Sequence, residues 1–199
     1  VIITSGHARE GKSTVANSLT LTAHDPNRKA LLIDGDLLTT RPNQFFGISE
    51  NATGGLYALL NDNQADPEKL IVPTRVDGLS FLPRGQRVQP TENGNVQKPL
   101  AAALVELRKK YDVIFIDTPP LFTSNLAHQW AALADLIVVV ARIFVTRPRD
   151  VIEAIQTCKL YSRAPVGVAL NCVQLTGAYR RASNYYFSKK KTKPHQIAA

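Results

Sequence analysis

A glycine-bearing segment between an apolar run and a helical pattern constrains the fold of this chain more than any other feature. Residues 6–14 read Gly-His-Ala-Arg-Glu-Gly-Lys-Ser-Thr and directly follow the apolar residues 1–3. The spacing G-x-x-x-x-G-K-S directs successive backbone N–H groups and the positive end of a helix dipole at one point. The segment therefore predicts a strand, a phosphate-binding loop and a helix, with a nucleoside triphosphate as ligand.

Each residue type in this loop has a chemical reason to be there. In such loops the lysine, here Lys12, reaches the β- and γ-phosphates, and the serine hydroxyl, here Ser13, ligates Mg²⁺. Glycines let the backbone approach the phosphate oxygens closely. We expect the nucleotide to be bound by the whole loop, that is by Gly6, His7, Ala8, Arg9, Glu10, Gly11, Lys12, Ser13 and Thr14.

The rest of the chain alternates short apolar runs with longer helical patterns, as parallel sheets covered by helices do. We expect strands at residues 1–4, 30–34, 79–82, 113–117, 136–141 and 166–170. We expect helices at residues 12–23, 96–110 and 149–161, the last with an apolar face of Val151, Ile152, Ile155 and Leu160, and a surface loop within residues 83–99. The predicted fold class is α/β, with three layers and a mostly parallel central sheet flanked by helices.

Composition and charge divide the chain into a core domain and a tail. With 44% hydrophobic and 20% charged residues, 199 residues suffice for one compact domain, expected at 1–176. The net charge of +8 is concentrated in residues 177–199, which we expect to form a basic, tyrosine-containing flexible tail. A nucleic-acid site is the alternative, but the body shows no interleaved aromatic platform or base-reading helix. We therefore expect no nucleic-acid partner.

The sequence also bears on the compartment. No apolar stretch reaches the roughly 18 residues that a membrane-spanning helix needs. Cys158 and Cys172 form no C-x-x-C pair and have no Cys/His cluster beside them, so we expect reduced core thiols of a cytoplasmic protein. The chain begins in mid-strand at Val1 and contains no methionine, so we interpret it as a piece of a longer protein. A transmembrane or regulatory segment ahead of Val1 stays an open alternative.

Carboxylates follow two of the expected strands. Asp34 and Asp36 come at the end of one apolar run, and Asp117 ends another, as the aspartate of a Walker B element does. Taken singly, an aspartate at a strand end is a turn residue or a helix cap. Because the carboxyl ends of parallel strands share one edge of a sheet, we expect all three to arrive there beside Ser13.

The order of these motifs resembles the cytoplasmic catalytic domain of bacterial tyrosine autokinases, P-loop NTPases that belong with polysaccharide co-polymerases of capsule and exopolysaccharide export. The resemblance rests on the phosphate loop, on D-x-D-L at 34–37, on D-T-P-P at 117–120 and on a terminal tyrosine cluster. Residues 55–60, 82–85, 107–112 and 167–171 are similar to that family too, so the match covers nearly the whole chain.

The resemblance implies roles for particular residues. ATP or ADP and Mg²⁺ would be the cofactors, with Lys12, Asp34 and Asp36 catalytic and with Ser13, Asp34 and Asp117 at the metal. Asp34 and Asp36 would serve the metal or accept the proton of the attacking tyrosine hydroxyl. Asn171 matches a position that touches adenine in related ATPases, and a turn-forming asparagine is the alternative.

The resemblance further implies a substrate, partners and a location. The candidate autophosphorylation sites are Tyr179, Tyr185 and Tyr186, reached by a neighbouring subunit of a homo-oligomer; the alternative is a tail that docks on its own domain. The implied partners are a membrane-spanning polysaccharide co-polymerase or activator segment, fused upstream or separate, and a cognate tyrosine phosphatase. The implied location is the cytoplasm, at the inner face of the plasma membrane.

Three departures from the family pattern bear on catalytic rate and oligomer contacts. Arg9 replaces a usual glycine, and unless it keeps an ordinary φ it costs roughly 1–2 kcal/mol. Residues 38–40 read Leu-Thr-Thr where an arginine-rich stretch is usual, with Arg41 and Pro42 displaced. The position of a common acidic residue holds Leu126, or Asn125 if the register slips by one.

Three functions remain open at this point. The first is an ATP-dependent tyrosine autokinase in a polysaccharide export assembly. The second is a partition- or division-site-type ATPase switch, which His7 disfavours because those proteins carry a second lysine near the start of the loop. The third is a catalytically weakened, nucleotide-responsive interaction module, which Arg9 and Leu126 favour.

Overall fold

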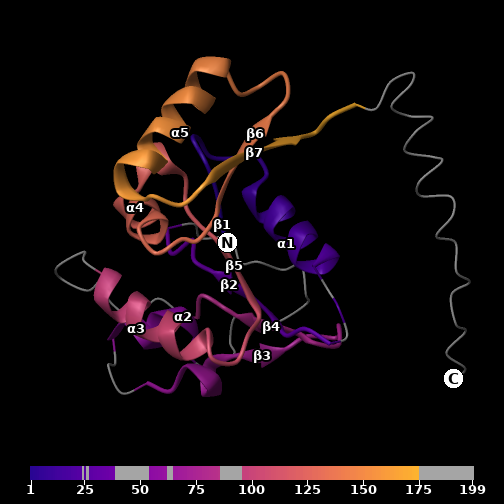
Figure 1. Ribbon diagram of the computed structural model, residues 1–199, viewed down its shortest axis with the longest axis vertical. Coiled ribbons are helices and arrows are strands. Elements are labelled where there is room, and N and C mark those ends of the chain that lie inside the picture. The colour runs from indigo at the N-terminus through magenta and orange to yellow at the C-terminus, as the bar shows by residue number, and fades with distance from the viewer. Residues whose placement is uncertain (24, 26, 39–53, 62–64, 86–95, 175–199) are drawn as a thin grey trace, which may run out of the picture.

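The strands form one sheet whose order brings the phosphate loop to its centre. The computed structural model describes residues 1–23, 25, 27–38, 54–61, 65–85 and 96–174, and these contain seven strands in the order β3-β4-β2-β5-β1-β6-β7 (Figure 1). The strands are β1 (Ile2–Ser5), β2 (Ala30–Asp34), β3 (Val72–Pro73), β4 (Leu79–Leu82), β5 (Val113–Asp117), β6 (Ile137–Arg142) and β7 (Val166–Asn171). All neighbours pair parallel except β3, which runs antiparallel to β4 at the edge.

Helices cover both faces of this sheet, which confirms the predicted three-layer α/β class. The helices are α1 (Lys12–Thr22), α2 (Gly55–Asn61), η2 (Pro67–Leu70), α3 (Gln97–Leu107), η3 (Leu121–Thr123), α4 (Asn125–Ala131) and α5 (Pro148–Tyr161). Figure 1 shows α1 on one side of the sheet and α2 to α5 on the other.

The alternation of buried residues along each strand explains this layering. On β2, Leu31 and Ile33 pack in the cluster that α2 and α3 cover, whereas Leu32 packs in the cluster that α1 covers. Successive side chains of a strand point to opposite faces, so a strand buried on both sides is apolar throughout. The continuous apolar runs of the sequence are therefore central strands.

The six predicted strands are confirmed, but five short elements were missed. The two-residue edge strand β3, the seven-residue helices α2 and α4 and the short 3₁₀ helices η2 and η3 were not predicted. The helix expected at 96–110 ends at Leu107, within the range that was given.

Two predictions about buried residues are wrong in part. On α5 the buried side chains are Ala154 and Cys158, whereas Ile152 and Leu160 are 57% and 81% exposed. Small residues on this face let α5 pack closely on the layer below. Cys158 is a core thiol as expected, but Cys172 follows β7 and is exposed.

Several segments named in the sequence analysis lie outside the described residues, and the membrane prediction can be examined only within them. The tail at 177–199 and Arg41 and Pro42 lie outside them, as does most of the loop expected within 83–99. Among the residues that are described, no helix has the length and apolar character needed to cross a bilayer.

Candidate active site

The carboxyl edge of the sheet brings together the residues that the sequence singled out. Strand β5 lies between β2 and β1, with Asp117 in register with Asp34 on one side and with Ile3 on the other. The phosphate loop leaves β1 at this same edge. Lys12, Asp34, Asp36 and Asp117 are all buried there, each less than a tenth exposed.

Asp117 has a strongly shifted pKa. Burial raises its pKa from 3.8 to about 7, and a hydrogen bond with the Ser13 side chain opposes that rise. The charges of Asp34 and Asp36 raise the pKa further, while that of Lys12 lowers it. The pKa of Asp117 thus reflects its burial first and the charged groups around it second.

The donor set fits Mg²⁺. Asp117 Oδ1 is buried and has no hydrogen-bond partner, so an oxygen ligand is available beside the Ser13 hydroxyl. The described residues contain no group of three or more His, Cys, Asp or Glu side chains able to hold a metal. Mg²⁺ needs no such group, because it binds through one or two protein oxygens together with phosphates and water.

The loop conformation depends on two left-handed residues. Gly11 has φ 95° and directly precedes α1, which begins at Lys12. Arg9 has φ 66°, which is the left-handed conformation that glycine usually adopts. Arg9 therefore carries the backbone strain that a non-glycine residue has in this conformation. Gly6 is packed so closely that a Cβ there would lie 2.8 Å from the Phe122 ring.

The loop residues divide into exposed and buried ones. His7, Ala8, Arg9, Ser13 and Thr14 are exposed, whereas Gly6, Glu10 and Lys12 are buried. The charge of the buried Lys12 acts on Asp117, so the lysine lies near the carboxyl edge of the sheet.

Asn171 lies against the loop rather than apart from it. Its Nδ2 donates to the Glu10 carbonyl oxygen at 3.0 Å, and its Oδ1 accepts from the Cys172 N–H at 2.8 Å. A Cβ on Gly11 would collide with this amide. Asn171 thus braces the loop, and the contact with adenine stays a prediction.

The turn after β2 is held from two directions. The Gly35 N–H donates to the Asp117 carbonyl at 2.8 Å, and the indole Nε1 of Trp130 donates to the Gly35 carbonyl at 3.2 Å. Asp36 Oδ1 accepts from the Leu38 N–H at 3.2 Å, so Asp36 also has the turn role that an aspartate at a strand end can have.

Arg84 is a residue of this edge to which sequence reasoning gave no role. It follows β4, is buried, and its Nη1 lies 3.4 Å from the Asp36 carbonyl oxygen. The signal was an arginine two residues after an apolar strand, because a buried guanidinium beside carboxylates offsets their charge. The candidate tyrosines Tyr179, Tyr185 and Tyr186 lie outside the described residues.

Comparison with known proteins places this site in a family. The family model described as AAA domain matches residues 4–160. The tyrosine-protein kinase CpsD of Streptococcus agalactiae is 31% identical over 195 residues, which are 96% of this chain and 83% of that protein.

Solved structures agree with these matches. The VpsO kinase domain superposes with a TM-score of 0.75 at 29% identity, over 87% of this chain and 84% of that one. The septum site-determining protein MinD of Pyrococcus horikoshii, complexed with Mg-ADP, gives a TM-score of 0.68 at 26% identity, over 85% and 68% of the two chains.

The fold and the phosphate loop define an α/β P-loop protein of the NTPase class with an AAA domain. Within that class, the chain belongs to the family of bacterial tyrosine-protein kinases. Its enzyme class is accordingly protein-tyrosine kinase.

Proposed function

We propose that this chain is an ATP- and Mg²⁺-dependent protein-tyrosine autokinase that regulates polysaccharide polymerisation and export. The observation that carries the proposal is the meeting of Lys12, Asp34, Asp36 and Asp117 beside the phosphate loop. Phosphoryl transfer needs in-line positioning and neutralised charge more than covalent help from the protein, and in this proposal Lys12 and bound Mg²⁺ supply the positive charge.

In this proposal different side chains bind the phosphates and the metal. Lys12 binds the β- and γ-phosphates, and Ser13 and Asp117 hold Mg²⁺, with Asp34 as a further ligand. Bound Mg²⁺ neutralises the charge on the phosphate oxygens.

The transfer step moves the γ-phosphoryl group of ATP to the hydroxyl of the acceptor tyrosine. Its hydroxyl oxygen forms a bond to the γ-phosphorus, the bond from that phosphorus to the β–γ bridging oxygen breaks, and ADP leaves. The hydroxyl proton passes to Asp36 or Asp34, because a phenol of pKa about 10 must lose its proton as the new bond forms.

The substrate and partners of the proposal follow from the tail and the relatives. We propose Tyr179, Tyr185 and Tyr186 as acceptors, presented to a neighbouring copy in a homo-oligomer. The relative CpsD is named as a tyrosine-protein kinase, and another relative is named from a Klebsiella pneumoniae cps region. The cps-region name supports an association with polysaccharide biosynthesis machinery. We propose, as the resemblance implies, a membrane-spanning co-polymerase or activator as partner, a tyrosine phosphatase as antagonist, and work at the inner face of the plasma membrane.

A switch ATPase is the second candidate, because the MinD structure shares the fold at 26% identity. Against it, the loop position at which partition and division ATPases carry a second lysine holds His7. A weakened nucleotide-responsive module is the third, and the left-handed Arg9 is the observation in its favour.

One experiment separates the three candidates. The 199-residue chain is incubated with γ-labelled ATP and Mg²⁺, alongside the Lys12→Met and Asp36→Asn variants. Phosphotyrosine in the tail that both variants lack supports the autokinase. Phosphate release without labelled protein supports the switch ATPase, and bound nucleotide with neither product supports the weakened module.

A further inference from the structure

Glu10 is a buried carboxylate in a stretch of loop that is otherwise exposed. Its neighbours His7, Ala8 and Arg9 are exposed, whereas Glu10 is 2% exposed. A carboxylate beside a phosphate site repels the ligand, so its burial there needs a reason. The reason lies in what its two oxygens contact.

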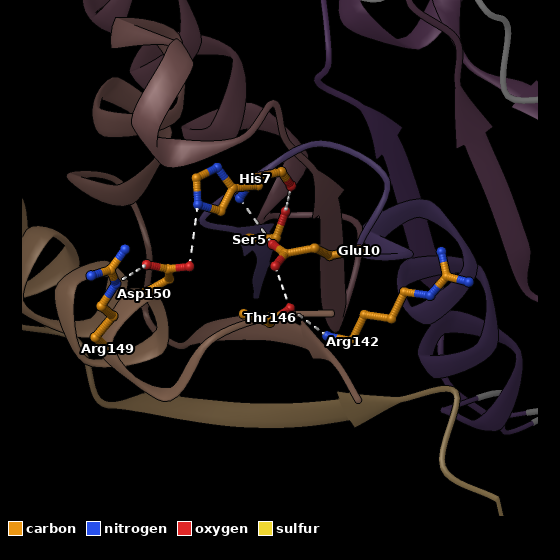
Figure 2. A network of polar contacts seen from close by, with 7 residues as sticks. All are labelled: Ser5, His7, Glu10, Arg142, Thr146, Arg149 and Asp150. Atoms are coloured by element: carbon orange, nitrogen blue, oxygen red, sulfur yellow. Dashed lines mark hydrogen bonds and ion pairs between the residues drawn. The ribbon is translucent and has the colours of Figure 1, made fainter. Parts of the chain in front are cut away.

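Both oxygens of Glu10 accept hydrogen bonds from the protein (Figure 2). Oε2 accepts from the backbone N–H of His7 at 2.9 Å, which closes the loop on itself. Oε1 accepts from the hydroxyl of Thr146, which comes from the connection between β6 and α5, 136 residues away. Both oxygens of the Glu10 side chain are thus engaged within the protein, one by the loop itself and one by a distant connection.

Thr146 is held firmly enough to serve as an anchor. Its Oγ1 accepts from the Arg142 N–H at 2.8 Å, and its own N–H donates to the Arg142 carbonyl at 2.8 Å. Within this turn Phe144 has φ 63° and is 93% exposed. A bulky residue keeps a left-handed backbone only where the surroundings enforce it, and such strain gathers at functional sites.

Two more contacts tie the loop to the same side of the sheet. Asn171 at the end of β7 donates to the Glu10 carbonyl, and His7 Nε2 lies 3.6 Å from Asp150 Oδ2 on the first turn of α5. Figure 2 shows His7, Asp150 and Arg149 on one side of Glu10, and Thr146 and Arg142 on another. The loop is thus attached to β6, α5 and β7 through side chains.

We infer that Glu10 is a positioning residue, which with Thr146 fixes the phosphate loop in its ligand-binding shape and so sets nucleotide affinity. The inference rests on the proposed nucleotide binding. Thr146 is the informative position, because its hydrogen bond to the loop is made to Glu10 and a variant there changes no residue of the loop.

The test measures the affinity of the 199-residue chain for fluorescent mant-ADP with Mg²⁺, together with the thermal unfolding midpoint. Thr146→Val keeps the shape and removes the donor, so the Kd should rise roughly tenfold, as expected for a lost hydrogen bond to a charged group. Thr146→Ser keeps the hydroxyl and should restore the Kd to within about twofold. Glu10→Gln keeps an acceptor for the His7 N–H, so its Kd should lie between those of Thr146→Ser and Thr146→Val.

The matched control is Thr74→Val. The Thr74 hydroxyl also bridges a turn, donating to the Leu79 carbonyl at 2.9 Å and accepting from the Val76 N–H at 3.1 Å, at the far edge of the sheet. This variant should lower the unfolding midpoint and leave the Kd unchanged. A double variant of Glu10→Ala with Thr146→Val should bind no worse than Glu10→Ala alone, because the two side chains act as one unit.

Three results would overturn the inference: an unchanged Kd in Thr146→Val, an equal rise in Thr74→Val, or additive effects in the double variant. A wild-type chain that binds no mant-ADP would overturn the proposed function as well. Wild-type binding with an unchanged Thr146→Val overturns the positioning role alone.

Discussion

The side chains of Ser13 and Asp117 meet by a hydrogen bond, although one belongs to the helix after β1 and the other ends β5. The second oxygen of Asp117 is buried without a partner. In a protein without Mg²⁺ or nucleotide this carboxyl group has a pKa of about 7, against 3.8 for an ordinary aspartate. This carboxyl group is therefore half protonated near pH 7 in the absence of a cation, whereas it must be ionised to hold Mg²⁺.

The first prediction concerns stability and pH without ligand. Because the native pKa of Asp117 lies above the unfolded value, the folded chain binds more protons between about pH 4 and 7. The free energy of unfolding should therefore fall as pH rises through this window, by at most about 1.4 kcal/mol per pH unit. Urea unfolding at a series of pH values measures this slope.

Asp117→Asn should remove that part of the slope and make the ligand-free chain more stable than wild type at pH 7.5. The matched control is Asp77→Asn, at an exposed aspartate, which should keep the wild-type slope. A slope in Asp117→Asn equal to that of wild type would contradict the assignment.

The second prediction concerns protons released on ligand binding. A carboxyl group that holds Mg²⁺ must ionise, so Mg·ADP binding near pH 6.5 should release up to about one proton per chain. Titration calorimetry in two buffers of different ionisation enthalpy counts these protons. Release should vanish at pH 9, where Asp117 is already ionised, and no difference between pH 6.5 and pH 9 would speak against Asp117 as the source.

The third prediction separates the backbone of Arg9 from its guanidinium. Arg9→Ala removes the side chain and keeps the left-handed strain, whereas Arg9→Gly removes both. Arg9→Gly should be more stable than Arg9→Ala by about 1 kcal/mol. Chemical unfolding of the pair measures this difference, and equal stabilities would mean that the loop relaxes around residue 9.

The fourth prediction concerns the contact between Gly11 and Asn171. Gly11→Ala adds a Cβ that collides with the amide of Asn171 and also strains a φ of 95°. The variant should lose stability and bind nucleotide weakly. Adding Asn171→Ala should relieve the collision but leave a backbone penalty of about 1–2 kcal/mol, seen in the unfolding free energy. Full recovery in the double variant would show that φ does not matter there.

Much of this fold could be predicted because its central strands are buried on both faces. A run such as residues 113–117 has few alternatives to a core strand, and an aspartate at its end then falls on the ligand edge of the sheet. That rule, together with the phosphate-loop motif, predicted that Asp34, Asp36 and Asp117 lie at the edge of the sheet that holds Ser13, without any contact being known.

What the sequence did not reveal depends on contacts between distant residues. The strand β3 has two residues, one of them Pro73, and exists because β4 offers an edge. The role of Glu10 depends on Thr146, which no local pattern connects to it. On α5 the exposed positions of Ile152 and Leu160 contradict the helical pattern, because packing is decided by the small residues Ala154 and Cys158.

The indole of Trp130 gives this protein an optical probe of its own. The chain has one tryptophan, and its side chain is 1% exposed. The indole N–H donates a hydrogen bond to the carbonyl oxygen of Gly35, which lies between Asp34 and Asp36 in the sequence. Indole emission depends on the polarity and hydrogen bonding around the ring. Unlabelled wild-type protein should therefore signal, through one fluorophore, each movement of the turn that carries its two candidate catalytic carboxylates.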